Sequence, residues 1–150
     1  MRSIEHFIGG QSVAGTSGRY SDVFDPNSGK VQAKVSLASA AELDRAVQNA
    51  AAAQPGWAAV NPQRRARVMM EFVRLLNMHR NELAELLASE HGKVVSDAHG
   101  DVLRGLEVIE FACGIPHLQK GEYTQGAGPH IDVYSAHQPL GVVAGVTPFN

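Results

Sequence analysis

The sequence has little of several features that specialised proteins depend on, and each shortage excludes a class of function. Its 150 residues include a single cysteine, Cys113, which excludes an internal disulfide and a paired-cysteine metal or redox site. The net charge of −2 comes with no extended basic patch of the kind that nucleic acid requires. No apolar run is long enough to span a membrane, and the N-terminus lacks the apolar core of a secretory signal. We therefore expect a cytoplasmic protein with no nucleic-acid or membrane partner.

Motifs that carry chemistry are also scarce. The histidines show neither H-x-H nor H-E-x-x-H spacing, so no metal site is predicted. Nucleotide-binding G-x-G-x-x-G, Walker A and hydrolase G-x-S-x-G patterns are all missing. The one basic cluster, Arg64, Arg65 and Arg67, is predicted to lie on a solvated helix face. Cys113 is predicted to end a helix and is interpreted as a small core residue, not a nucleophile.

What is present is the pattern of a folded α/β protein. Residues 4–36 predict short strands and turns, with a hairpin over 6–15 and a turn at 24–29. Residues 30–37 alternate polar and apolar side chains, which is typical of a half-buried strand. This meander precedes three predicted helices.

The helices are indicated by their capping residues. Ser39 and Glu42 form a capping box that begins the first helix, and Pro55–Gly56 is predicted to end it. The second helix is predicted to begin at Asn61–Pro62 and to run to about Glu90, with Gly92 as its left-handed C-cap. The third is predicted over residues 97–112.

The last thirty residues predict strands. Residues 121–129 are interpreted as a glycine-rich loop, and 131–138 as a strand with one exposed face. Residues 141–150 are almost all apolar or small, which predicts a strand buried on both faces of a parallel sheet. Because such a strand needs neighbours and covering helices, we expect the chain to be the front part of a longer protein.

Two side chains are candidates for a site, and each has a plain structural alternative. Asn150 would end the buried strand, where its amide could stabilise an oxyanion or simply form a turn. Arg104 lies among Asp101, Glu107 and Glu110. It is predicted either to join a surface ion-pair lattice or to bind a substrate carboxylate.

Several separated segments resemble the aldehyde dehydrogenase superfamily in order and spacing. They are Phe7–Gly10, Asp25–Lys30, Glu90–Lys93 and Leu140–Asn150, the last of which matches the strand that leads into the family's Pro-(Trp/Phe)-Asn motif. Residues 101–114 are similar to the branch that oxidises methylmalonate semialdehyde and acylates coenzyme A.

The resemblance implies the N-terminal part of an aldehyde dehydrogenase-like fold, with a β meander, three helices, the start of a parallel Rossmann-like sheet and an oligomerisation strand. Residues 1–122 and 139–150 would belong to the NAD-binding domain. Residues 123–138 would belong to an oligomerisation excursion that makes a dimer or tetramer. The catalytic domain would be absent from this chain, which is therefore expected to be inactive alone.

The resemblance also implies a chemistry. A cysteine thiolate outside this chain attacks the semialdehyde, hydride passes to NAD, and coenzyme A takes the acyl group to give propionyl-CoA or acetyl-CoA. By position, Asn150 matches the oxyanion-hole amide, while Thr147, Pro148 and Phe149 match contacts to the cofactor. Arg104 matches the arginine that binds the substrate carboxylate, and no metal is implied.

Two other functions remain open at this point. One is a hydrolytic aldehyde dehydrogenase of another substrate class. The other is a non-enzymatic interaction module that pairs through the exposed strand at 131–138.

Overall fold

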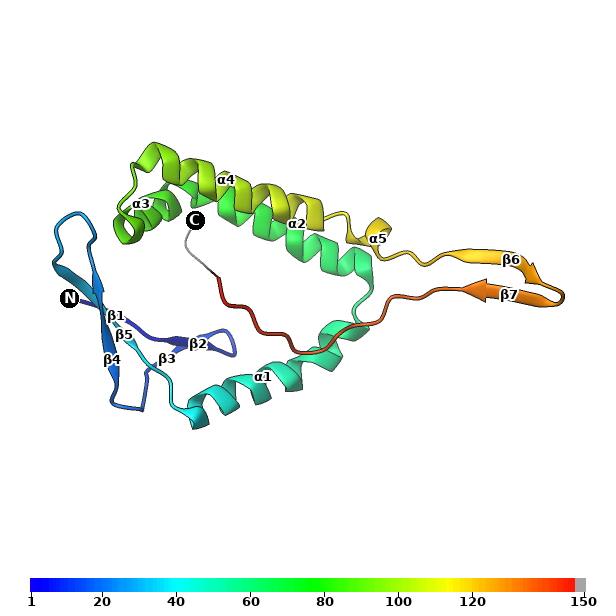
Figure 1. The fold of residues 1–150 in the computed structure, drawn as a ribbon, viewed down its shortest axis with the longest axis horizontal. Helices are drawn as coiled ribbons and strands as arrows, with labels where there is room; N and C mark the ends of the chain where they lie inside the picture. The colour runs from blue at the N-terminus through cyan, green and yellow to red at the C-terminus, as the bar shows by residue number, and fades with distance from the viewer. Residues whose placement is uncertain (148–150) are drawn as a thin grey trace.

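The computed structural model describes residues 1–147 and confirms the predicted α/β class. The strands are β1 (Arg2–Ile4), β2 (His6–Ile8), β3 (Gln11–Val13), β4 (Tyr20–Phe24), β5 (Val31–Ser36), β6 (Tyr123–Gly128) and β7 (Ile131–Tyr134). The helices are α1 (Ala40–Ala59), α2 (Pro62–Met78), α3 (Arg80–His91), α4 (Val95–Ala112) and α5 (Ile115–Leu118). The strands β1, β4 and β5 close one end, α2 to α4 form one side, and α1 runs along the other (Figure 1).

The N-terminal strands form a small mixed sheet and a separate hairpin. The sheet has the order β1-β5-β4, with β1 parallel and β4 antiparallel to β5. The predicted strand is confirmed as β5, but its alternation is followed only in part. Ala33 is buried and Lys34 is exposed as predicted, whereas the polar Ser36 is buried and Leu37 is 39% exposed. The predicted hairpin over residues 6–15 is also confirmed as β2 paired with β3.

Helix α1 begins at its predicted cap but continues past its predicted end. Both hydrogen bonds of the Ser39–Glu42 capping box are present. The prediction that Pro55–Gly56 ends the helix is wrong, since α1 runs to Ala59 with Pro55 inside it. Proline removes one backbone hydrogen bond. The turn that follows is still closed by the N–H of Val60, which donates to the carbonyl of Trp57 at 3.1 Å.

The single helix predicted from residue 61 to about residue 90 is two helices. The backbone leaves the helical path at His79, with φ −102° and ψ 12°. Its N–H ends α2 on the carbonyl of Leu75, and its carbonyl accepts the N–H of Leu83 to begin α3. Neither glycine nor proline lies at this break, so no local signal predicts it. Gly92 is the left-handed C-cap of α3 as predicted, at φ 87°.

The core is thin and made of small side chains. Ala84, Ala88 and Ala98 pack where α3 meets α4, with Leu87 and Val102 against them. Helix α4 begins at Val95, slightly before the predicted residue 97, and ends at Ala112 as predicted. Among residues 1–147, no helix has both the length and the apolarity to cross a bilayer.

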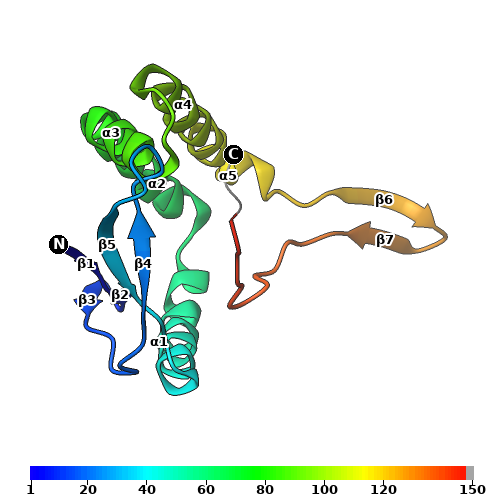
Figure 2. The same ribbon diagram turned by 60° about the vertical axis from the view of Figure 1, so that its left-hand side comes forward.

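The hairpin of β6 and β7 stands out from the rest of the molecule (Figures 1 and 2). The prediction of a glycine-rich loop at residues 121–129 is wrong, because β6 occupies most of it. The bulge at Gly126 is held by Asp132, whose carboxylate accepts the N–H of Gly126 at 2.8 Å and the hydroxyl of Tyr123 at 2.5 Å. The predicted strand over residues 131–138 is shortened to β7.

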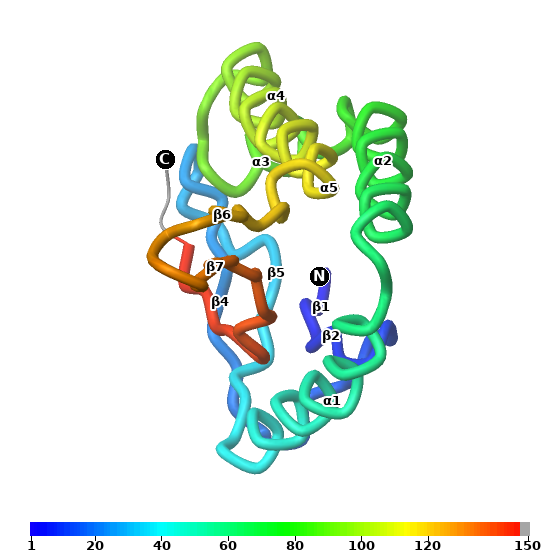
Figure 3. Tube along the Cα trace, turned by 90° about the vertical axis from the view of Figure 1, so that its right-hand side faces the viewer, coloured from blue at the N-terminus to red at the C-terminus, as the bar shows by residue number. Residues whose placement is uncertain are grey.

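Residues 139–147 lack the predicted buried strand. They form no strand within the described part of the chain, and Val143 and Val146 are 74% and 99% exposed. The physical reason is that residues 1–147 offer no neighbouring strand with which this segment pairs. Seen end-on, α4 lies at the top of the molecule, α2 at the right and α1 at the bottom (Figure 3).

Candidate functional site

The predicted catalytic and cofactor-binding residues fall at the end of the segment that follows β7. Thr147 is exposed and lies in irregular backbone. Pro148, Phe149 and Asn150 lie outside the described residues, so their predicted roles are untested. Of these four predicted residues, the structure therefore describes Thr147.

The first part of this segment lies beside helix α1. Gly141, Val142 and Val143 line an open groove of 340 Å³ together with the Trp57 side of α1. Trp57 is 46% exposed there. Positive φ at Gly141, 97°, lets the chain turn into this groove, because such backbone is strained for other residues.

Arg104 lies on the surface in an ion pair, which is one of the two arrangements predicted for it. Its side chain is 80% exposed, and Nη1 donates to Oε2 of Glu107 at 2.7 Å. Asp101, another predicted neighbour, instead pairs with Lys93. The guanidinium thus keeps donors free to face a ligand, and no contact tests the predicted carboxylate role.

A small polar cavity lies where α2 begins. It measures 130 Å³ and is lined by Arg65, Gln119, His137 and Gln138 among others. Arg65 donates from Nη2 to Oε1 of Gln119 at 2.8 Å, while its buried Nε has no acceptor among residues 1–147. The predicted solvated position is therefore wrong for Arg65, which is half-buried. The cavity is smaller than pockets that hold cofactors, which are about 300–1,000 Å³.

Glu42 is a buried carboxylate that has a structural role. Glu42 is 4% exposed, and its oxygens accept the N–H and hydroxyl of both Ser39 and Thr16. The backbone N–H of Ser39, then that of Thr16, lowers the pKa of Glu42 from 4.5 to about 2. Nε2 of His6 lies 3.7 Å from Oε1 of Glu42. The carboxylate stays ionised at neutral pH, so it cannot serve as a general acid.

Glu5 is held in the same way on the other side of His6. It accepts the hydroxyls of Ser3 and Ser36 at 2.5 Å each and the N–H of Gly15 at 2.9 Å. The Ser3 hydroxyl, then that of Ser36, lowers the pKa of Glu5 from 4.5 to about 2. We call Glu5, Glu42 and their donors the carboxylate clamp. It fastens the N-terminal strands to the start of α1.

The described residues form no metal-binding site. No group of three or more histidine, cysteine, aspartate or glutamate side chains in residues 1–147 is placed to hold an ion. Cys113 caps the end of α4 and is half-buried, as expected for a packing residue.

Comparison with known proteins shows the family to which the chain belongs. The model of the aldehyde dehydrogenase family matches residues 13–150. The chain is 44% identical over 150 residues to malonate-semialdehyde dehydrogenase of Pseudomonas aeruginosa, covering 100% of this chain and 30% of that protein. It is 41% identical over 147 residues to the acylating mitochondrial methylmalonate-semialdehyde dehydrogenase of Arabidopsis thaliana, covering 98% of this chain and 24% of the relative.

Solved structures of the same family also match this chain. A methylmalonate-semialdehyde dehydrogenase of Sinorhizobium meliloti complexed with NAD matches with a TM-score of 0.95 and 63% identity, covering 100% of this chain and 30% of that one. The enzyme of the same name from Oceanimonas doudoroffii matches with a TM-score of 0.88 and 41% identity, covering 93% and 28%. The chain thus spans about 30% of the length of the relatives it matches, in their N-terminal part.

Proposed function

Because the chain belongs to the aldehyde dehydrogenase family, we propose that it forms the N-terminal part of an NAD-dependent, coenzyme A-acylating (methyl)malonate-semialdehyde dehydrogenase. The whole protein would oxidise the semialdehyde and pass the acyl group to coenzyme A, giving propionyl-CoA or acetyl-CoA. Residues 1–150 alone would be inactive. The reducing cytoplasm is the proposed setting, since Cys113 is the one cysteine.

One observation carries this proposal. The match to the Sinorhizobium meliloti structure extends over the whole chain, at 63% identity and a TM-score of 0.95. By contrast, an NAD-dependent benzaldehyde dehydrogenase of Corynebacterium glutamicum reaches 31% identity and a TM-score of 0.76. The difference supports a semialdehyde carrying a carboxylate over the alternative of another substrate class.

The described residues do not form a dinucleotide site by themselves. Such sites place the phosphates at a glycine-rich turn between a strand and a helix. In residues 1–147, no such turn follows a strand of a parallel βαβ unit. We therefore assign to these residues no step in which a bond is made or broken. The proposed cofactor contacts are Thr147, Pro148 and Phe149, and the proposed oxyanion donor is the Asn150 amide.

The hairpin of β6 and β7 supports the proposed oligomer. Tyr123, Ile131, Val133 and Tyr134 are between 52% and 78% exposed on it. An arm that carries apolar and aromatic side chains away from the body suits a contact with another subunit. We propose that residues 123–138 form the oligomerisation excursion of a dimer or tetramer.

A chimera tests the proposed activity. Residues 1–150 of this chain would replace the matching segment of the Pseudomonas aeruginosa relative, and NAD reduction with methylmalonate semialdehyde would be followed with and without coenzyme A. We expect activity that depends on coenzyme A and yields a thioester, and none from the 150-residue chain alone. NAD reduction by the purified chain alone would contradict the proposal. A folded chimera without activity would also contradict it, because this segment would then fail to replace its counterpart.

A further inference from the structure

The small polar cavity at the start of α2 is lined by hydrogen-bond donors and by no acidic side chain. Its lining comes from four parts of the chain: Ala58 of α1, Arg65 of α2, Gln119 after α5, and His137, Gln138 and Pro139 after β7. Arg65 brings one positive charge to it. A charge that is taken out of water without a counter-charge is costly, so the cavity favours a negatively charged occupant.

One donor of the Arg65 guanidinium lacks an acceptor. Nη2 of Arg65 donates to Oε1 of Gln119 at 2.8 Å, while Nε is buried and has no acceptor among residues 1–147. Nη2 carries two N–H groups, so it can donate to Gln119 and to a second acceptor at once. The N–H of Nε and one N–H of Nη2 point in parallel and form the fork that binds two oxygens of one oxyanion.

The side chains that face Arg65 across the cavity supply further donors. The amide of Gln138 carries two N–H groups, and the imidazole ring of His137 carries at least one. A planar carboxylate would use its two oxygens on the fork alone. A phosphate has further oxygens that accept strongly and face other directions. The lining therefore suits a tetrahedral oxyanion better than a carboxylate.

The size of the cavity limits its occupant to a small ion. Its volume is 130 Å³, while one water molecule takes about 30 Å³ of the liquid. This space holds a few water molecules or one inorganic phosphate. It is well below the roughly 300–1,000 Å³ of pockets that hold cofactors, so a nucleotide is too large to enter whole.

We infer that this cavity is a site for one phosphate ion, held by the guanidinium fork of Arg65 and by donors of His137 and Gln138. The site lies at the root of the arm formed by β6 and β7 (Figures 1 and 2), since Gln119 precedes β6 and His137 follows β7. A bound phosphate thus ties the base of the arm to the start of α2. The inference does not depend on the proposed reaction.

The stability of the chain in phosphate tests the inference. The thermal midpoint would be measured by circular dichroism from zero to about 50 mM phosphate, with sodium chloride adjusted to keep the ionic strength constant. Because the ion binds the folded chain, we expect the midpoint to rise by about 2–5 °C and to saturate. In the same buffers, hydrogen exchange should slow at residues 119–123 and 134–138, the two ends of the arm.

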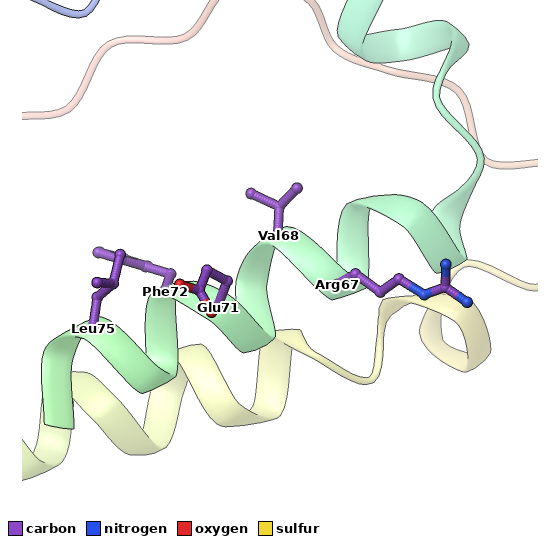
Figure 4. A pocket seen from close by; sticks show the side chains of 5 residues that line it. All are labelled: Arg67, Val68, Glu71, Phe72 and Leu75. Carbon is purple, nitrogen blue, oxygen red and sulfur yellow. The ribbon is translucent and has the colours of Figure 1, made fainter. Parts of the chain in front are cut away.

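Matched substitutions locate the site. Arg65→Gln removes the fork and should abolish the rise, while Arg65→Lys keeps the charge without the fork and should retain less than about half of it. Arg67→Gln removes the same charge from the same helix and should leave the rise intact, because Arg67 lines a separate groove with Phe72 (Figure 4). His137→Ala should roughly halve the rise. It takes the place of Arg65→Gln if circular dichroism shows that the latter does not fold.

Three outcomes would overturn the inference. The first is a midpoint that does not respond to phosphate at constant ionic strength. The second is an equal rise in the wild-type chain and in Arg65→Gln, which would show the general stabilisation that phosphate gives by exclusion from protein surfaces. The third is an equal loss of the rise in Arg65→Gln and Arg67→Gln, which would assign the effect to the charge of α2 and not to the cavity.

Discussion

The carboxylate clamp and the exposed apolar side chains of this chain differ in one respect. The carboxylates of the clamp have their hydrogen-bond partners within the chain, whereas the apolar side chains have no covering residues within the described part of the chain. In the clamp, Glu42 is 4% exposed and accepts four hydrogen bonds from Ser39 and Thr16. Among the apolar side chains, Val146 is 99% exposed and Phe72 is 45% exposed. The chain therefore pairs the buried oxygens of Glu42 within itself, while it leaves large apolar side chains such as Val146 in water.

This difference indicates which parts of the fold depend on other polypeptide. Buried hydrogen bonds that close within residues 1–42 need nothing further to form. Apolar burial is proportional to the area removed from water, at about 25 cal/mol per Å², so an uncovered face contributes little until something packs on it. We expect the clamp to behave alike in the isolated chain and in a whole enzyme, and the exposed apolar side chains to differ.

Acid is expected to have the largest effect on stability, because it protonates both carboxylates of the clamp. The pKa values of Glu5 and Glu42 are lowered from 4.5 to about 2. Groups with a lowered folded-state pKa contribute stability that is fully present above the unfolded value and is lost as the pH falls through the folded one. The thermal midpoint should thus be nearly constant above pH 4.5 and fall between there and about pH 2. Circular dichroism melts across this range would check it, and an unchanged midpoint down to pH 3 would contradict it.

Glu42→Gln tests one carboxylate of the clamp at neutral pH. The substitution keeps the size of the side chain but turns one acceptor oxygen into a donor, which then faces the N–H of Ser39 or Thr16. We expect the thermal midpoint to fall by about 5–10 °C, because a buried donor loses its acceptor. Glu85→Gln on the exposed face of α3 is the control and should change it by less than about 1 °C. Equal midpoints for both variants would show that the clamp does not hold the strands to α1.

The contacts of the clamp show which parts of the fold can be predicted from the sequence. The capping box of Ser39 and Glu42 was predictable because its residues lie three apart and interact within one turn. The contact of Glu42 with Thr16 was not, since 26 residues separate them. The same holds for β6, whose glycines predict a loop until β7 pairs with it.

The candidate site was less predictable than the fold. The sequence placed Arg104 among acidic neighbours correctly, because i to i+3 pairs follow from helical geometry. It could not find the cavity at Arg65, which joins residues from α1, from α2, from the turn after α5 and from the segment after β7. The strand predicted over residues 141–150 is absent from residues 141–147 for a related reason, since its pattern indicates burial that residues 1–147 do not provide.

Replacing exposed apolar side chains should affect association more than folding. The double substitution Val143→Asp with Val146→Asp should roughly halve light scattering on heating and move the thermal midpoint by less than about 2 °C, since both side chains are exposed. Gln48→Asp with Gln63→Asp adds the same charge without removing apolar area and is the control. A wild-type chain that melts cooperatively without scattering would favour the free-standing interaction module.

Arg104 should give the smallest effect on folding and the most selective effect on function. Its ion pair with Glu107 is exposed, so Arg104→Ala should move the thermal midpoint by less than about 1 °C. In the chimeric enzyme the same substitution should raise KM for a carboxylated semialdehyde by about tenfold or more, because a charge-assisted contact is lost. Arg104→Lys should restore only part of it, since lysine lacks the planar fork. An uncharged aldehyde should be unaffected, and an equal loss with both substrates would show that Arg104 does not bind the carboxylate.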